Sequence, residues 1–170
     1  MGKFICLLAT ITSFSVLMLG CGENNEPVAD RLTVPAAPIQ LRHAPVLTIQ
    51  GFTTIELGGL PVQIHYLRVP PANASVPFET VLFFHGLPTS NAIWEPVMDQ
   101  LSQLTNVDSY AISFPGFGRS DAPAPEMLDY SETSLNQVPF KFADSLGIER
   151  FVGVVHDMGG PSFICPAIEN

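Results

Sequence analysis

The chain has 170 residues, of which 46% are hydrophobic and 14% are charged, and 16 acidic against 7 basic side chains give a formal net charge of −9. This composition is typical of a folded globular domain and excludes a disordered, highly charged chain. Because the acidic balance opposes binding to phosphate backbones, we expect no nucleic-acid partner.

The first residues resemble a bacterial lipoprotein signal. Lys3 precedes an apolar stretch over 4–19, and Leu-Met-Leu-Gly-Cys at 17–21 resembles a lipobox, whose cysteine is lipidated and becomes the new N-terminus. We therefore expect residues 1–20 to be a signal peptide and Cys21 to carry palmitate, which anchors the chain to a membrane of the bacterial cell envelope. An uncleaved anchor helix is the alternative, but the apolar stretch is short for the ~20 residues of a full span.

A tether and a single domain are expected after the signal. Residues 21–45 are polar and contain four prolines, which predicts an extended, flexible segment. Residues 46–170 then form the domain. Once Cys6 leaves with the signal and Cys21 is lipidated, Cys165 is left alone, so no disulfide is expected within the chain.

The domain begins with a predicted antiparallel hairpin. Short β-rich runs at 46–52 and 62–69 flank the turn signal Gly58-Gly59. Apolar and polar residues alternate over part of the second run, which is typical of an antiparallel strand at a sheet edge.

Strands and helices are then expected to alternate. Three continuous apolar runs predict buried strands, and two segments with helical periodicity lie between them, the second closed by Gly147 and kinked by Pro139. The strands are placed at 79–85, 107–114 and 151–156, and the helices at 92–104 and 131–146. This order predicts an α/β fold with a mostly parallel sheet and right-handed crossovers.

Three glycine-containing segments stand at the carboxyl ends of the predicted parallel strands, where such sheets bind ligands. They are His85 to Pro88, Phe114 to Asp121, and His156 to Gly160. The middle segment lacks the third glycine of a dinucleotide-binding fingerprint, so a strand-end loop is the preferred interpretation and no cofactor is expected.

Asp157 is the candidate nucleophile. It follows an apolar strand and precedes the paired glycines Gly159 and Gly160, a pattern that predicts a sharp strand-to-helix turn with the helix N-terminus aimed at the carboxylate. A carboxylate is ionised at neutral pH and needs no general base before it attacks. The plainer alternative is that Asp157 only caps the following helix.

The loop His85-Gly86-Leu87-Pro88 is the candidate oxyanion loop. The backbone N–H of Leu87, together with that of Met158, is placed to stabilise a developing negative charge. Taken alone, this loop is also compatible with an ordinary turn.

In this order and spacing, the three segments resemble the α/β-hydrolase fold, and His156-Asp157-Met158-Gly159-Gly160 resembles the branch of epoxide hydrolases and haloalkane dehalogenases, whose nucleophile is an aspartate. The resemblance covers residues 46–161, the N-terminal half of that fold. It implies that Asp157 attacks an electrophilic carbon of a small apolar substrate to give an alkyl-enzyme ester, with Leu87 and Met158 as oxyanion amides. His85, Gly86, Pro88, His156, Gly159 and Gly160 would support the site, without metal.

Departures from the resemblance bear on the substrate. Dehalogenases usually have Asn and Trp where this chain has Leu87 and Met158, which favours an epoxide hydrolase, although these enzymes also often have Trp at the second position. No Gly-X-Ser-X-Gly occurs in the chain, which disfavours a serine esterase.

The resemblance also implies parts that these 170 residues are not expected to supply, namely the histidine and acid that activate water. Pro166 is expected to break the helix after the glycines. The alternative to a lipid-anchored hydrolase is therefore an inactive, truncated lipoprotein remnant.

Overall fold

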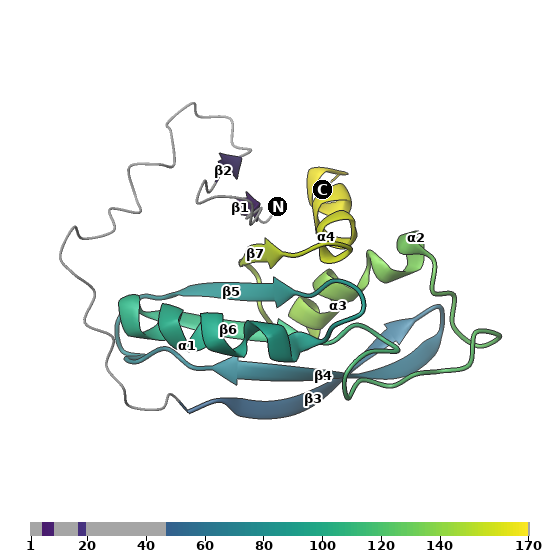
Figure 1. Ribbon diagram of the computed structural model, residues 1–170, viewed down its shortest axis with the longest axis horizontal. Helices are drawn as coiled ribbons and strands as arrows, with labels where there is room; N and C mark the ends of the chain where they lie inside the picture. The colour runs from purple at the N-terminus through teal and green to yellow at the C-terminus, as the bar shows by residue number, and fades with distance from the viewer. Residues whose placement is uncertain (1–4, 9–16, 20–46, 170) are drawn as a thin grey trace.

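A computed structural model describes residues 5–8, 17–19 and 47–169 of the chain. The strands form one sheet in the order β2-β1-β7-β5-β6-β4-β3 (Figure 1). From β5 to β7, strands and helices alternate along the chain, so the predicted α/β class is confirmed.

The opening hairpin consists of β3 (Ile49–Leu57) and β4 (Leu60–Val69), joined through Gly58 and Gly59. Both strands are longer than the apolar runs that predicted them, because the antiparallel ladder continues down to the turn. β3 lies at one end of the sheet, as the hairpin prediction requires, and β4 pairs antiparallel with β6.

The centre of the sheet is parallel, as predicted. β5 (Glu79–Phe84) lies between β6 (Val107–Ile112) and β7 (Val152–Val155) and pairs in parallel with both. All three strands therefore end at the same edge, which lies on the right in Figure 1.

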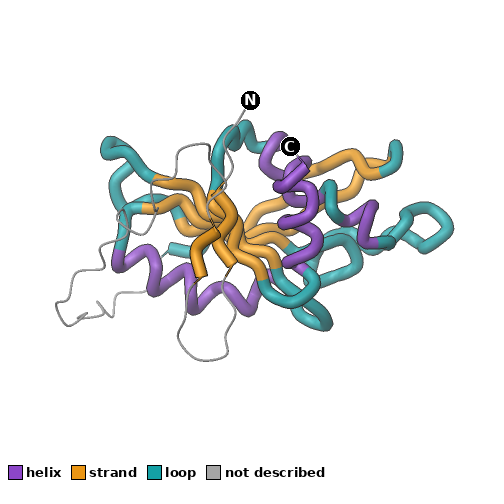
Figure 2. Tube along the Cα trace, turned by 90° about the horizontal axis from the view of Figure 1, so that it is seen from above, coloured by secondary structure: helices purple, strands orange, loops and turns teal. Residues whose placement is uncertain are grey.

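Helices cover both faces of the sheet (Figure 2). The 3₁₀ helix η2 (Asn91–Trp94) and α1 (Glu95–Leu104) bring Trp94 and Met98 to one face. α2 (Glu132–Leu135), α3 (Val138–Ser145) and α4 (Gly159–Glu169) cover the other face. The core of that second face contains Phe84, Phe142 and Phe163, all fully buried, which fixes α3 and α4 against the strands.

The expectation at Pro166 is wrong, whereas at Pro139 the helix is interrupted more fully than the expected kink. The predicted helix 131–146 is divided into α2 and α3. Pro139 stands in the first turn of α3, where its missing N–H costs no helical hydrogen bond. Pro166 does not end α4, which continues to Glu169. One proline removes a single bond of the ladder, and the remaining bonds hold the helix together.

The predicted signal and tether lie largely outside the described residues. Within the predicted signal, β1 (Ile5–Leu8) pairs in parallel with β7, and β2 (Leu17–Leu19) pairs antiparallel with β1. Residues 21–45, with Cys21, are not described. Among the described residues, no helix has the length and apolar character needed to cross a membrane.

Candidate active site

Asp157 lies in a tight turn between β7 and α4. Its φ of 52° makes it the one residue other than glycine with a positive φ in the described part of the chain. This left-handed conformation is unfavourable for a residue with a side chain, so the surrounding contacts must hold it. The N–H of Gly160 donates to the Asp157 carbonyl at 2.9 Å and that of Gly159 donates to the His156 carbonyl at 3.0 Å, which closes the turn.

Backbone amides hold the exposed carboxylate of Asp157. The N–H of Leu87 donates to Oδ2 at 2.9 Å, across 70 residues of sequence. Hydrogen bonds from the amides of Leu87 and then Met158 lower the pKa of Asp157 below its usual value, because both stabilise the ionised form. The carboxylate is thus ready to act as an anion at neutral pH.

Two glycines permit this approach. A methyl group at Gly86 would overlap the Asp157 side chain. A methyl group at Gly159 would lie 2.6 Å from the carbonyl oxygen of Phe84 and 2.9 Å from that of His85. Since backbone atoms of β5 cannot swing aside as a flexible side chain can, the helix α4 reaches the sheet this closely only with glycine at its first position.

His85 ties together the loops that follow β5 and β6. Its ring is buried, with Nδ1 2.8 Å from the Gly86 carbonyl oxygen, and Nε2 accepts the N–H of Phe114 at 3.1 Å. An acceptor at Nε2 requires the neutral tautomer with the proton on Nδ1. Burial, the largest cause, and the neighbouring His156 both lower the pKa of His85, so the neutral form persists.

The loop after β6 is fixed to β4 through Asp121. The Asp121 carboxylate accepts the N–H of Gln63 at 2.8 Å, and its own N–H donates to the Gln63 carbonyl at 2.9 Å. The Ser120 hydroxyl adds a bridge between His65 and Ser113. This anchorage holds the loop that contributes Phe114 and Phe117 to the site.

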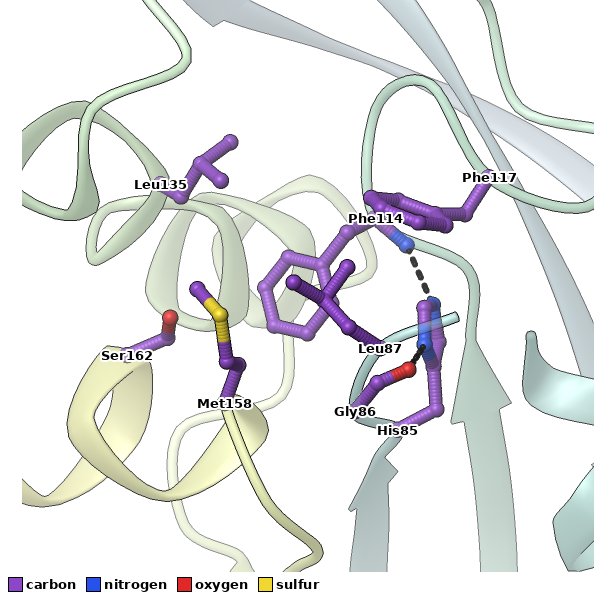
Figure 3. Close-up of a pocket in the computed structure, with 8 residues that line it drawn as sticks. All are labelled: His85, Gly86, Leu87, Phe114, Phe117, Leu135, Met158 and Ser162. Carbon is purple, nitrogen blue, oxygen red and sulfur yellow. Dashed lines mark hydrogen bonds between the residues drawn. The ribbon is translucent and has the colours of Figure 1, made fainter. Parts of the chain in front are cut away.

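A small, mostly apolar hollow, partly open to solvent, lies beside the turn (Figure 3). Its lining comes from the two strand-end loops, α2, the Asp157 turn and α4. The lining residues are His85, Gly86, Leu87, Phe114, Phe117, Leu135, Met158 and Ser162. Because both ring nitrogens of His85 have partners, the hollow suits an apolar molecule.

The structure brings the predicted site residues together at the carboxyl ends of β5 and β7. His156 is exposed; its N–H donates to the Phe84 carbonyl at 3.1 Å, and its ring meets the edge of Trp94. Sequence reasoning missed Leu135 and Ser162 as lining residues, because each reaches the hollow only through the packing of a helix. Among the described residues, no group of three His, Cys, Asp or Glu side chains could hold a metal ion.

Comparison with known proteins agrees with this architecture. A family model described as the alpha/beta hydrolase fold matches residues 79–162. Among curated proteins, bifunctional epoxide hydrolase 2 of Rattus norvegicus is 27% identical over 126 residues, which is 74% of this chain and 21% of that protein. The chain therefore spans about a fifth of the length of this relative.

Solved structures show the same fold. A probable hydrolytic enzyme from Pseudomonas aeruginosa superposes with a TM-score of 0.57 at 28% identity, over 66% of this chain and 34% of that one. A haloalkane dehalogenase variant from Bradyrhizobium elkanii gives a TM-score of 0.54 at 23% identity, over 70% and 35%. The strand order, the strand-to-helix turn and the matched family model together assign this domain to the α/β-hydrolase fold. Its relatives include epoxide hydrolases, and dehalogenases share its fold.

Proposed function

We propose that the chain is an exported, lipid-anchored α/β hydrolase of the epoxide hydrolase type, in which Asp157 is the nucleophile. One observation supports this most strongly: Asp157 is held in a left-handed conformation with its carboxylate on the backbone amides of Leu87 and Met158. A helix-capping aspartate needs neither this conformation nor an amide from a loop 70 residues away.

In the first half-reaction, an oxygen of the Asp157 carboxylate forms a bond to one carbon of an epoxide. The C–O bond at that carbon breaks, and its electron pair stays on the ring oxygen, which then takes a proton. The product is an alkyl ester on Asp157. The mostly apolar hollow beside Leu87 and Phe117 suits the hydrocarbon part of such a substrate.

In the second half-reaction, water attacks the carbonyl carbon of the ester, and negative charge develops on the carbonyl oxygen. The Leu87 amide already donates to a carboxylate oxygen of Asp157, and the Met158 amide also favours the ionised form, so both amides are positioned to stabilise that charge. A base must take a proton from the water. His85 is unsuited because both of its nitrogens are engaged, so we propose that none of the residues described by the structure serves as this base.

The proposal therefore expects the ester to accumulate. Incubation of the chain with a small apolar epoxide, followed by peptide mass analysis, should find the adduct on Asp157. Asp157→Ala should abolish it, whereas Asp144→Ala, which removes an exposed carboxylate at the end of α3, should leave it unchanged. No adduct on folded protein would instead favour the inactive lipoprotein remnant.

A haloalkane is the weaker substrate candidate. The hollow presents Leu87 and Met158 where a halide would need N–H donors from side chains, and its lining contains neither Asn nor Trp. An alkyl bromide that labelled Asp157 faster than an epoxide would reverse this order.

The anchor is tested separately from the chemistry. The protein extracted from membranes should contain fatty acid, and Cys21→Ser should remove it, whereas Cys165→Ser should not. An extracted mass equal to that of lipidated residues 21–170 would mean that these residues are the whole mature protein. A heavier species would mean that the chain is part of a longer protein, while an unmodified Cys21 would refute the anchor.

A further inference from the structure

One polar side chain in the wall of the hollow has no hydrogen-bond partner in the part of the chain that the structure describes. Among the lining residues, His85 and Ser162 are the two with polar side chains. Both ring nitrogens of His85 are engaged, by the Gly86 carbonyl oxygen and the Phe114 N–H. The hydroxyl of Ser162 forms no hydrogen bond with any described residue, although Ser162 is only 3% exposed.

A hydroxyl in this position has unused hydrogen-bonding capacity. It can donate one hydrogen bond and accept two, and a buried polar group that makes none loses the bonds that water gave it in the unfolded chain. An apolar residue at this position would avoid that cost, and the buried lining residues Phe114 and Leu135 are apolar. A molecule in the hollow can therefore satisfy a group that the described protein leaves unpaired.

The helix α4 places Ser162 at a fixed distance from the reacting group. Met158 directly precedes α4 and Ser162 stands four positions later, so the two side chains lie on one face, about one helical turn apart. Figure 3 shows the Ser162 side chain beside that of Met158, with its oxygen toward Leu135. The neighbouring Phe163 is fully buried against Phe84, with ring centroids 5.2 Å apart, which holds this turn of the helix in place.

From this placement we infer that Ser162 determines specificity, through a hydrogen bond to a substrate oxygen outside the epoxide ring. Side chains one turn apart on a helix are separated by about 5–6 Å, which is the span of about four single bonds. The amide of Met158 marks the reacting end of the site, so the recognised oxygen lies about four bonds from the reacting carbon. This inference rests on the proposed function and names its substrate class.

The recognised oxygen belongs to a neutral group. No charged side chain is among the described residues that line the hollow, and the carboxylate of Asp157 lies beside it as an anion. A carboxylate or phosphate on the substrate would lose its hydration there without gaining a cationic partner. The substrate class is therefore a small epoxide with a hydroxyl or ether oxygen, in preference to a plain hydrocarbon epoxide or an epoxy acid.

The test compares two epoxides that differ in one group. The epoxide of homoallyl alcohol has its hydroxyl four bonds from the terminal ring carbon, and the terminal epoxide of pentene has a methyl group in its place. Both are incubated with the full chain, and the rate at which each labels Asp157 is measured by peptide mass analysis. In Ser162→Ala the ratio of the two rates, alcohol over hydrocarbon, should fall by about 2- to 12-fold, the worth of one neutral hydrogen bond.

Leu135→Val is the matched control. It shortens an apolar side chain of the same hollow and removes no polar atom, so it should leave the ratio unchanged. An unchanged ratio in Ser162→Ala, or an equal fall in Leu135→Val, would overturn the inference. Ser162→Ala should also unfold at a urea concentration no lower than the parent, because no described residue bonds the hydroxyl. A lower midpoint would show that the hydroxyl serves the fold, which also overturns the inference.

Binding separates this inference from the proposed chemistry. The NMR signal of the Met158 methyl group reports each epoxide in the hollow whether or not an ester forms. The ratio of the two dissociation constants should show the same loss of preference for the alcohol in Ser162→Ala. Absence of adduct from both epoxides, with this binding preference present, would refute the hydrolase and support the role of Ser162. Adduct formation without any preference lost in Ser162→Ala would support the hydrolase and overturn the role of Ser162.

Discussion

The two adjacent glycines at the start of α4 should respond oppositely to alanine. In Gly159→Ala the new methyl group meets the Phe84 and His85 carbonyl oxygens at 2.6 and 2.9 Å. Phe84 O also accepts the His156 N–H, so it cannot easily move. Overpacking of this kind costs about 1–3 kcal/mol.

Gly160→Ala is the matched control. Its methyl group would lie 3.9 Å from Val155 and 4.0 Å from Ile164, which is ordinary contact. Removing a glycine from a helix stabilises it by roughly 0.5–1 kcal/mol, so the two variants should differ by roughly 1.5–4 kcal/mol.

Urea unfolding measures this difference. With a slope near 2 kcal/mol per molar, a typical value for a small domain, a difference of about 2 kcal/mol separates the two midpoints by about 1 M. Equal midpoints, or a less stable Gly160→Ala, would refute the argument that backbone contact selects glycine at Gly159.

Three further outcomes are expected. His85→Phe should cost about 1–3 kcal/mol by leaving the buried N–H of Phe114 unpaired. Burial lowers the pKa of His85 in the folded protein, so the unfolded chain binds more protons below pH 6.5. The parent protein should therefore lose stability as the pH falls through that range. Urea denaturation of His85→Phe at several pH values should show a smaller loss. Arg68→Met, which removes two hydrogen bonds to a buried carboxylate, should destabilise the fold by about 1.5–3 kcal/mol. Arg150→Met breaks an exposed pair and should cost less than about 1 kcal/mol, so equal costs in urea unfolding would contradict the role of burial. A carbon-13 NMR titration of Asp157 should give a midpoint below 3.8, and a higher midpoint would contradict the amide contacts.

The parallel strands β5 and β6 were predictable because each is an apolar run bounded by a local signal, whereas β1 and β2 were not predicted. Glu79–Phe84 stops at Gly86, and Val107–Ile112 stops before Pro115, so both the existence and the order of the parallel strands follow from sequence. The hairpin followed from alternation around Gly58-Gly59, although its ladder runs further than the apolar pattern.

Helix interruptions were less predictable. The same missing N–H divides a helix at Pro139 and is accommodated at Pro166 within α4. The outcome depends on whether the proline falls in a first turn or in a helix held by burial of residues such as Phe163 against the sheet. That information is tertiary and is absent from the local pattern.

The residues of the site also differ in how far the sequence predicts them. Asp157, Leu87 and Met158 stand in motifs at strand ends, so their meeting could be predicted from topology. The lining by Leu135 and Ser162 depends on where α2 and α4 pack, and no spacing in the sequence encodes it.

The hydrogen bond between Leu87 and Asp157 has a consequence for how the protein folds. The two residues are 70 positions apart, and they meet only after β5 and β7 have paired in the register that sets Phe84 against Val155. Parallel pairing across such a separation must overcome a large loop-closure entropy, and it is slow compared with local contacts. Reactivity at Asp157 should therefore emerge late during refolding. If epoxide is added in short pulses at successive refolding times, the amount of Asp157 adduct should report when the sheet has assembled.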